Sequence, residues 1–279
     1  MLTLDTDQLS TQEIQQYLQY AIAPRPICFA STIDLEGNVN LSPFSFFNLF
    51  SMNPPICIFS PSRRVRDNTT KHTLENIKEV PECVINIVNY NMVQQVSLSS
   101  CDYPKGTSEF TKAGFTELAS ELVRPPRVAE SPIQLECTVK EVIALGAQAG
   151  AGNLVLAEIK KIHLHESILD ASNHIDQAKL DLVARLGGDW YARITEANLF
   201  KVEKPNTKLG IGFDQLPKAI KDSSLLTANE KAQLANTSIL PLLNTTIELK
   251  LSSQKIDQIK AALSNNETEL AWTIIQTLV

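Results

Sequence analysis

The densest group of residues able to hold a ligand lies at positions 41–48, which read Leu-Ser-Pro-Phe-Ser-Phe-Phe-Asn. Three aromatic rings, two hydroxyls and an amide in so short a stretch offer a flat apolar wall together with hydrogen-bonding groups. In an extended chain, Phe44 and Phe46 would share one face and Ser45 would point to the other. The stretch therefore indicates a site for a planar ligand or, since core aromatics are common, an aromatic core strand with a polar edge.

A second group of polar residues, at positions 60–73, carries positive charge. Residues 61–68 read Pro-Ser-Arg-Arg-Val-Arg-Asp-Asn and lead into a helix expected at about 71–78, with Thr69 or Thr70 as its N-cap. The start of a helix presents free backbone N–H groups and the positive end of the helix dipole, which suit a phosphate. Cations and hydroxyls coincide with that helix start, so the stretch indicates a phosphate site or else a solvated basic loop.

The composition fits a globular protein of 279 residues, of which 43% are hydrophobic and 20% charged. A net charge of −6 argues against a protein that depends on contacts to nucleic-acid phosphates. We expect no membrane association, because no apolar run is long enough to cross a bilayer, and no signal peptide. The five cysteines are scattered without CxxC spacing, which suits a reducing cytoplasm.

Apolar runs bounded by turn residues predict strands at 27–33, 56–60, 83–88, 133–145 and 154–165, and one that continues into 41–48. Ser10 and Glu13 predict a capping box for a helix that ends near residue 21. Many antiparallel strands with short helices favour a closed barrel, mainly β with peripheral helices, over a doubly wound sheet.

The pattern becomes helical near the C-terminus. Asp214 is a candidate helix cap, Thr227 opens a second capping box, and helices are expected at 255–263 and 267–278. We therefore expect one domain over residues 1–205 and a helical C-terminal extension over residues 206–279.

Several short motifs, in a fixed order, are shared with one known family. They are Ala23-Pro24-Arg25-Pro26-Ile27, Ser31-Thr32, the stretch 42–48, Lys71-His72-Thr73-Leu74-Glu75-Asn76-Ile77, Tyr103-Pro104-Lys105-Gly106, the stretch 127–132 and Arg185-Leu186-Gly187-Gly188. Over roughly residues 17 to 204 the chain resembles the flavin reductase-like family of FMN-binding split-barrel proteins. The tail that begins at Gly210 resembles an extension that some longer members carry.

The resemblance implies FMN bound at the interface of a homodimer, NADH or NADPH as the electron donor, and, as often in the family, a partner monooxygenase. It assigns the flavin ring to Ser31, Thr32, Phe44, Ser45, Phe46 and Asn48. It assigns the ribityl phosphate to Ser60, Ser62, Arg63, Lys71 and Thr73. Residues from Arg185 to Tyr191 would approach the ring or the dimer contact. His72 departs from the aspartate usual in the family, and it leaves Lys71 and Thr73 in place.

The function implied is NAD(P)H-dependent reduction of flavin, and the alternative is a non-catalytic protein that stores or senses FMN. In either case the flavin carries the chemistry, and no side chain is predicted to act as acid, base or nucleophile. His163 and His165 share a face of one strand, but no third ligand lies nearby in sequence, so we expect no metal site. The glycine-rich stretch 146–153 lacks the GxGxxG order and leads into a strand, so it does not predict a dinucleotide-binding fold.

Overall fold

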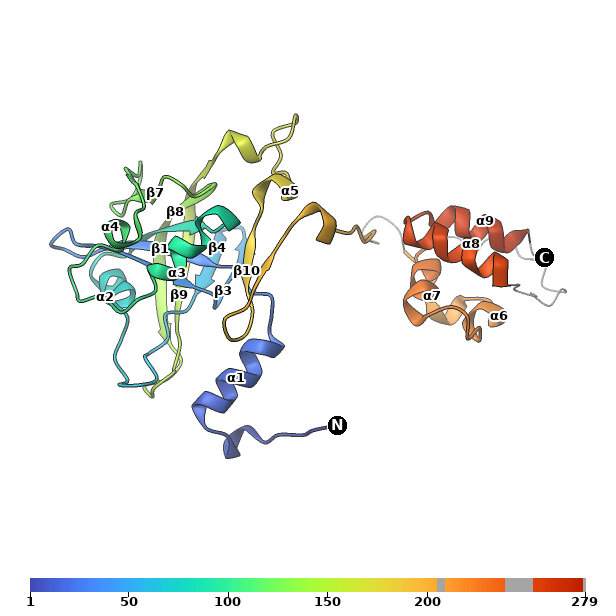
Figure 1. Ribbon diagram of the computed structural model, residues 1–279, viewed down its shortest axis with the longest axis horizontal. Coiled ribbons are helices and arrows are strands. Elements are labelled where there is room, and N and C mark those ends of the chain that lie inside the picture. Colours follow the sequence, from blue (N-terminus) through green and yellow to red (C-terminus); the bar gives the residue numbers. More distant parts are fainter. Residues whose placement is uncertain (205–208, 239–252, 278–279) are drawn as a thin grey trace. The chain divides into compact units, whose positions relative to one another are not determined.

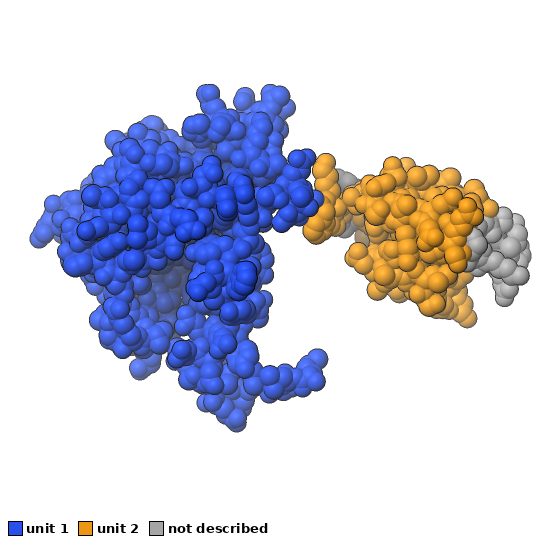
Figure 2. Space-filling view, viewed as in Figure 1, with its two compact units in different colours: residues 1–199 blue, residues 200–279 orange. Residues whose placement is uncertain are grey.

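The computed structural model describes residues 1–204, 209–238 and 253–277 (Figure 1). The chain folds into two compact units, Met1–Leu199 and Phe200–Val279, which are coloured separately in Figure 2. The division falls six residues before the boundary expected from the sequence pattern. Pro205, the last residue of the expected first domain, lies outside the described residues.

The first unit is built on one antiparallel sheet of seven strands, in the order β2-β1-β5-β8-β9-β4-β3 (Figure 1). Its strands are β1 (Cys28–Ile33), β2 (Val39–Phe44), β3 (Phe47–Met52), β4 (Pro55–Phe59), β5 (Glu82–Ile87), β8 (Ile133–Ala144) and β9 (Asn153–Leu164). Two short pairs accompany it, β6 (Glu117–Leu118) with β7 (Arg127–Val128) and β10 (Val183–Arg185) with β11 (Tyr191–Arg193).

The two edges of this sheet are consecutive in the chain. Only Ser45 and Phe46 separate the end of β2 from the start of β3, so the edges approach each other at this turn. The expected barrel, mainly β with peripheral helices, is therefore confirmed, and the unpaired edges of its described strands agree with the split barrel that the family resemblance implies. The strand expected to continue into 41–48 is β2, which ends at Phe44, and the chain turns before β3 begins at Phe47.

Short helices surround the sheet of the first unit. They are α1 (Thr11–Ala21), α2 (His72–Glu79), α3 (Val93–Leu98), α4 (Glu109–Ala113) and α5 (Gln177–Leu180), with 3-10 turns η1 (Thr6–Gln8), η2 (Tyr90–Met92), η3 (Glu166–Ile168) and η4 (Glu196–Asn198). The capping box of α1 is confirmed: the backbone N–H of Ser10 donates to the Glu13 carboxylate over 2.8 Å, and the N–H of Glu13 donates to the Ser10 hydroxyl.

The start of α2 differs from the expectation. Its N-cap is Lys71, whose side chain makes no capping hydrogen bond in the described part of the chain. The two threonines proposed as caps bond elsewhere, since the Thr69 hydroxyl donates to Asp67 over 2.6 Å and the Thr70 hydroxyl donates to Glu75 over 2.7 Å. The helix start is therefore one to two residues later than expected, and Lys71 itself stands at it.

Two apolar clusters hold the first unit together. One packs Phe44, Phe59 and four buried cysteines, Cys28, Cys57, Cys83 and Cys137, inside the curved sheet. The other packs Phe29 and Phe110, with residues of α3 and α4, on the opposite face of β1. Burial raises the pKa of the Cys57 thiol to about 11, which keeps this thiol protonated at neutral pH.

The second unit has its own core and is entirely helical in its described part. Its elements are η5 (Phe213–Gln215), α6 (Lys218–Lys221), α7 (Ala228–Ala235), α8 (Ser253–Ser264) and α9 (Thr268–Gln276). The capping box at Thr227 and the helical character of the extension are confirmed. Asp214 lies inside η5 and caps no helix, so that expectation was wrong. Leu278, the expected end of the last helix, lies outside the described residues.

A buried carboxylate ties a loop to the long hairpin β8–β9. Glu136 is fully buried and accepts the backbone N–H groups of Glu121, over 2.9 Å, and Leu122, over 2.6 Å. Its Oε1 also lies 2.7 Å from Nε2 of His163. His163 thus has a structural partner, and residues 1–204, 209–238 and 253–277 contain no group of three His, Cys, Asp or Glu side chains that could hold a metal.

We predict that Glu136→Gln lowers the free energy of unfolding by roughly 1.5–3 kcal/mol at neutral pH, because hydrogen bonds to a charged group are lost. Burial raises the pKa of Glu136, but the N–H donors and His163 lower it by more, so the net pKa is below the ordinary value of 4.5. This stabilisation is complete above pH 4.5 and is lost as the pH falls through the lower folded-state pKa. We would measure the melting temperature at several pH values between about 3 and 7. The melting temperature should fall less on acidification in Glu136→Gln than in the wild type, because the variant has no carboxylate to protonate at this position.

Candidate functional site

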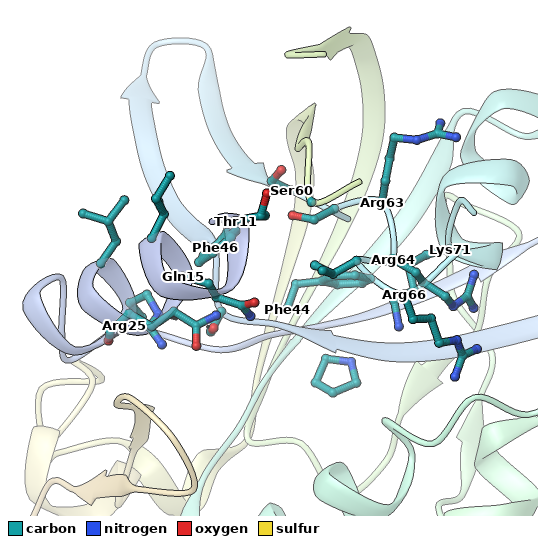
Figure 3. A pocket seen from close by; sticks show the side chains of 18 of the residues that line it. Thr11, Gln15, Arg25, Phe44, Phe46, Ser60, Arg63, Arg64, Arg66 and Lys71 are labelled. Carbon is teal, nitrogen blue, oxygen red and sulfur yellow. Dashed lines mark hydrogen bonds between the residues drawn. The ribbon is translucent and has the colours of Figure 1, made fainter. Parts of the chain in front are cut away.

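A cavity of about 810 Å³ lies in the first unit (Figure 3). Helix α1 forms one wall, the turn between β2 and β3 forms a second, and the basic loop 60–71 closes one end. Seven of the predicted site residues line it: Phe44, Ser45, Phe46, Ser60, Ser62, Arg63 and Lys71. The other five do not: Ser31, Thr32, Asn48, Thr73 and Tyr191.

The aromatic wall of the cavity is made by two rings with different surroundings. Phe44 is buried at the end of β2, where its ring packs against Phe59 at a centroid distance of 5.5 Å. Phe46 stands in the turn and is 46% exposed. The turn, rather than the alternation of an extended strand, brings both rings to the same cavity.

The three hydroxyl residues outside the cavity lining are fully buried in the protein interior. The Thr32 hydroxyl accepts from the Asn76 amide over 3.3 Å, and the Thr73 hydroxyl donates to the Asn40 amide oxygen over 2.7 Å. The Ser31 hydroxyl has no hydrogen-bond partner among the residues that the structure describes. These three side chains lie in the interior of the first unit, and their contact with a ligand stays a prediction.

The remaining two predicted residues lie on the surface. Asn48 is exposed on β3, and its side chain accepts the N–H of Leu49. Tyr191 lies on β11, where the Arg185 guanidinium stands 4.6 Å from its ring centroid. Their proposed roles near the ring or a dimer contact also stay predictions.

The basic end of the cavity holds three cations around one carboxylate. Asp102 lies 3.1 Å from Arg64, 3.0 Å from Arg66 and 3.4 Å from Lys71. Figure 3 shows these three cations together, whereas Arg63 points away from them. The Arg63 guanidinium instead donates to the Asn68 side chain over 2.6 Å. Arg64, Arg66 and Lys71 therefore form one cation cluster at this end of the cavity, and the phosphate role of Arg63, which also lines the cavity, stays a prediction.

Sequence analysis did not single out Arg64, Arg66 or Asp102. The basic loop itself was a visible signal, but Asp102 lies 38 residues beyond Arg64, and only the fold brings them together. Burial raises the pKa of Asp102, but the charges of Lys71 and Arg64 outweigh it, so the pKa lies below its usual value. Asp102 is therefore ionised at neutral pH.

The opposite end of the cavity is organised by a buried guanidinium. Arg25 is only 7% exposed and donates to the backbone carbonyls of Gln19, over 2.6 Å, Ile22, over 2.5 Å, and Leu186, over 2.9 Å. Its Nε also donates to the Ser45 hydroxyl over 3.4 Å. Arg25 therefore joins the end of α1 to the turn that carries the aromatic wall.

The fold and the cavity together define a class of protein: a split barrel with one cavity that has an aromatic wall and a basic end. Residues 20–179 match the flavin reductase like domain, and the chain belongs to this family.

Three similar proteins match this chain over nearly their whole length. An uncharacterized protein of Halalkalibacterium halodurans is 35% identical over 206 residues, which cover 73% of this chain and 97% of that protein. Nitrilotriacetate monooxygenase component B from Bacillus cereus is 28% identical, with a TM-score of 0.67, over 72% of this chain and 98% of that one. A split-barrel protein from Shewanella frigidimarina, proposed to be a flavin reductase, is 25% identical with a TM-score of 0.61, over 71% and 95% of the two chains.

Proposed function

We propose that the protein binds FMN in the cavity and reduces it with NADH or NADPH. The observation that carries the proposal is the pairing, in one cavity, of an aromatic wall at Phe44 and Phe46 with three cations at Arg64, Arg66 and Lys71. A planar ring needs the first and a phosphate needs the second. Membership of the flavin reductase like family supports the same ligand.

The residues present fit FMN by size and by chemistry. A volume of about 810 Å³ lies within the range of roughly 300–1,000 Å³ typical of sites for small molecules and cofactors. Arg64, Arg66 and Lys71 would hold the phosphate, and Phe44 with Ser45 and Phe46 would contact the ring. Ser60 and Ser62, which also line the cavity, offer hydroxyls to the phosphate or the ribityl chain.

Bound FMN would supply the hydride-accepting chemistry, and the chain would bind and orient it. Ile14 and Leu18 of helix α1 line the cavity and would shield part of a bound ligand from water. The nicotinamide would stack on the flavin, since the sequence carries no GxGxxG at a strand-to-helix turn. Every residue of the proposed site lies in residues 1–205, so residues 206–279 would be an extension outside the flavin site.

Partners form a separate part of the proposal. The edge strand β3 and the turn before it expose four large apolar side chains, Phe46, Leu49, Phe50 and Met52, which support a homodimer contact. Similarity to nitrilotriacetate monooxygenase component B supports a role as the reductase partner of a monooxygenase. Among the residues that the structure describes, no helix could cross a membrane. The cytoplasmic location inferred from the scattered cysteines stays a prediction.

A protein that stores or senses FMN without turnover is the second candidate. It has the same fold and cavity, and the exposed ring of Phe46 is compatible with either function. The two candidates differ in whether a nicotinamide reaches the flavin.

A steady-state assay tests the proposed function: purified protein should oxidise NADH or NADPH only when FMN is supplied. Light scattering on the FMN-loaded protein should give the mass of a dimer. Tight FMN binding with no oxidation of either nicotinamide would favour the storage or sensing protein. A monomer mass at micromolar concentration would contradict the homodimer.

A further inference from the structure

The carboxylate of Asp102 occupies the centre of the cation cluster that faces the cavity. It contacts Arg64, Arg66 and Lys71 at 3.0–3.4 Å, and it lines the cavity itself. An anionic ligand that binds to these cations would lie near the Asp102 carboxylate, which is already paired with all three of them. Figure 3 shows the three cations in one group at this end of the cavity.

Two of the three cations have other anchors. Arg64 also donates to the Thr69 hydroxyl over 3.1 Å and to the Thr70 carbonyl. Arg66 also pairs with Asp67 over 3.0 Å. Their positions therefore do not depend on Asp102 alone, and the effect of Asp102 on an anion is mainly that of its charge.

We propose that Asp102 is a built-in counterion that competes with the ligand's phosphate and limits the affinity of the site for anions. The inference rests on the proposed function, since it concerns the site assigned there to the phosphate of FMN. When a phosphomonoester dianion binds, Arg64, Arg66 and Lys71 exchange part of their contact with Asp102 for contact with the phosphate. Asp102 is a specificity-determining residue, because it penalises anions while leaving an uncharged ligand unaffected.

The consequence is that bound flavin exchanges readily with flavin in solution. Without Asp102 the same three cations would bind a phosphate dianion more tightly and release it more slowly. With Asp102 in place, the site favours a ligand that binds, is reduced and leaves, as a reductase that hands reduced flavin to another protein requires.

Asp102→Asn tests this directly, because it removes the charge and keeps the shape and an acceptor oxygen for Arg64. Fluorescence titration at low salt should show FMN affinity rising about five- to tenfold, as expected for removal of one like charge near a dianion in a partly exposed site. Riboflavin, which has no phosphate, should bind wild type and variant equally. The gain for FMN should shrink as salt is added.

Asp222→Asn is the matched control, since it makes the same change in net charge at an exposed position in the second unit. It should leave both affinities unchanged. Unchanged or weaker FMN binding in Asp102→Asn, with normal thermal melting, would overturn the inference. Asp102→Ser removes the carboxylate in a second way and replaces the asparagine variant should that one not fold.

Binding of inorganic pyrophosphate tests this inference independently of the proposed function, because it requires no flavin. If wild type bound neither FMN nor riboflavin, the proposed function would fail, and calorimetric titration with pyrophosphate would still report on the cluster. Stronger pyrophosphate binding by Asp102→Asn than by wild type would support the counterion role. Equal or weaker binding would overturn it.

Discussion

Lys71→Ala is expected to weaken FMN binding about tenfold or more at low salt. Lys71 lines the cavity at the start of α2. Its ammonium group donates to Asp102 over 3.4 Å and, with three N–H donors, can also donate to a phosphate. A charge-assisted contact of this kind contributes roughly 1.5–3 kcal/mol, and each 1.4 kcal/mol corresponds to about a factor of ten in affinity. Fluorescence titration with FMN measures the effect.

Riboflavin isolates the phosphate contribution, because it shares the ring and lacks the phosphate. Its affinity should change by less than about twofold in Lys71→Ala, within the ordinary effect of a surface substitution. Lys140→Ala is the matched control, since Lys140 is exposed on β8 and does not line the cavity. Equal losses for FMN and riboflavin would place the phosphate elsewhere.

Arg25→Ala is expected to have the largest effect on stability. Three backbone carbonyls and the Ser45 hydroxyl would lose a buried, charged donor. We expect the free energy of unfolding of the first unit to fall by about 3 kcal/mol or more. For a unit of this size, that corresponds to a fall in melting temperature of about 6–12 °C, which calorimetry would measure.

FMN binding by Arg25→Ala should weaken as well, because α1 and the turn at Ser45 lose the group that joins them. Arg193→Ala provides the control: Arg193 pairs with Asp181 over 2.8 Å at the surface, and exposed pairs contribute about 0–1 kcal/mol. If Arg25→Ala melts at the wild-type temperature and binds FMN normally, Arg25 does not organise this end of the cavity.

The sequence predicted those elements whose signals are local. The capping boxes at Ser10 and Thr227 involve residues three apart, so their partners can be identified from sequence alone. The N-cap of α2 was misplaced because Thr69 and Thr70 had competing partners in Asp67 and Glu75. Hydroxyl side chains can satisfy several neighbours, and the choice among them depends on the folded loop.

The sequence predicted several residues that line the cavity, but it did not predict how the charged side chains pair with one another. Phe44, Ser45 and Phe46 line the cavity as expected from their position. Arg63 donates a hydrogen bond to Asn68, whereas Arg64 and Arg66 form ion pairs with Asp102, which lies more than 30 residues further along the chain. The hydrogen-bond partners of adjacent arginines depend on such distant residues, and one sequence does not reveal them.

Anaerobic stopped-flow spectroscopy tests the central claim most directly. FMN-loaded protein would be mixed with NADH and, separately, with NADPH, and the flavin absorbance would be followed in time. We predict that at least one nicotinamide bleaches the oxidised flavin on a timescale of turnover, with rates of about 1 s⁻¹ or faster. Flavin that stays oxidised with both nicotinamides, in protein that binds FMN tightly, would contradict the reductase function.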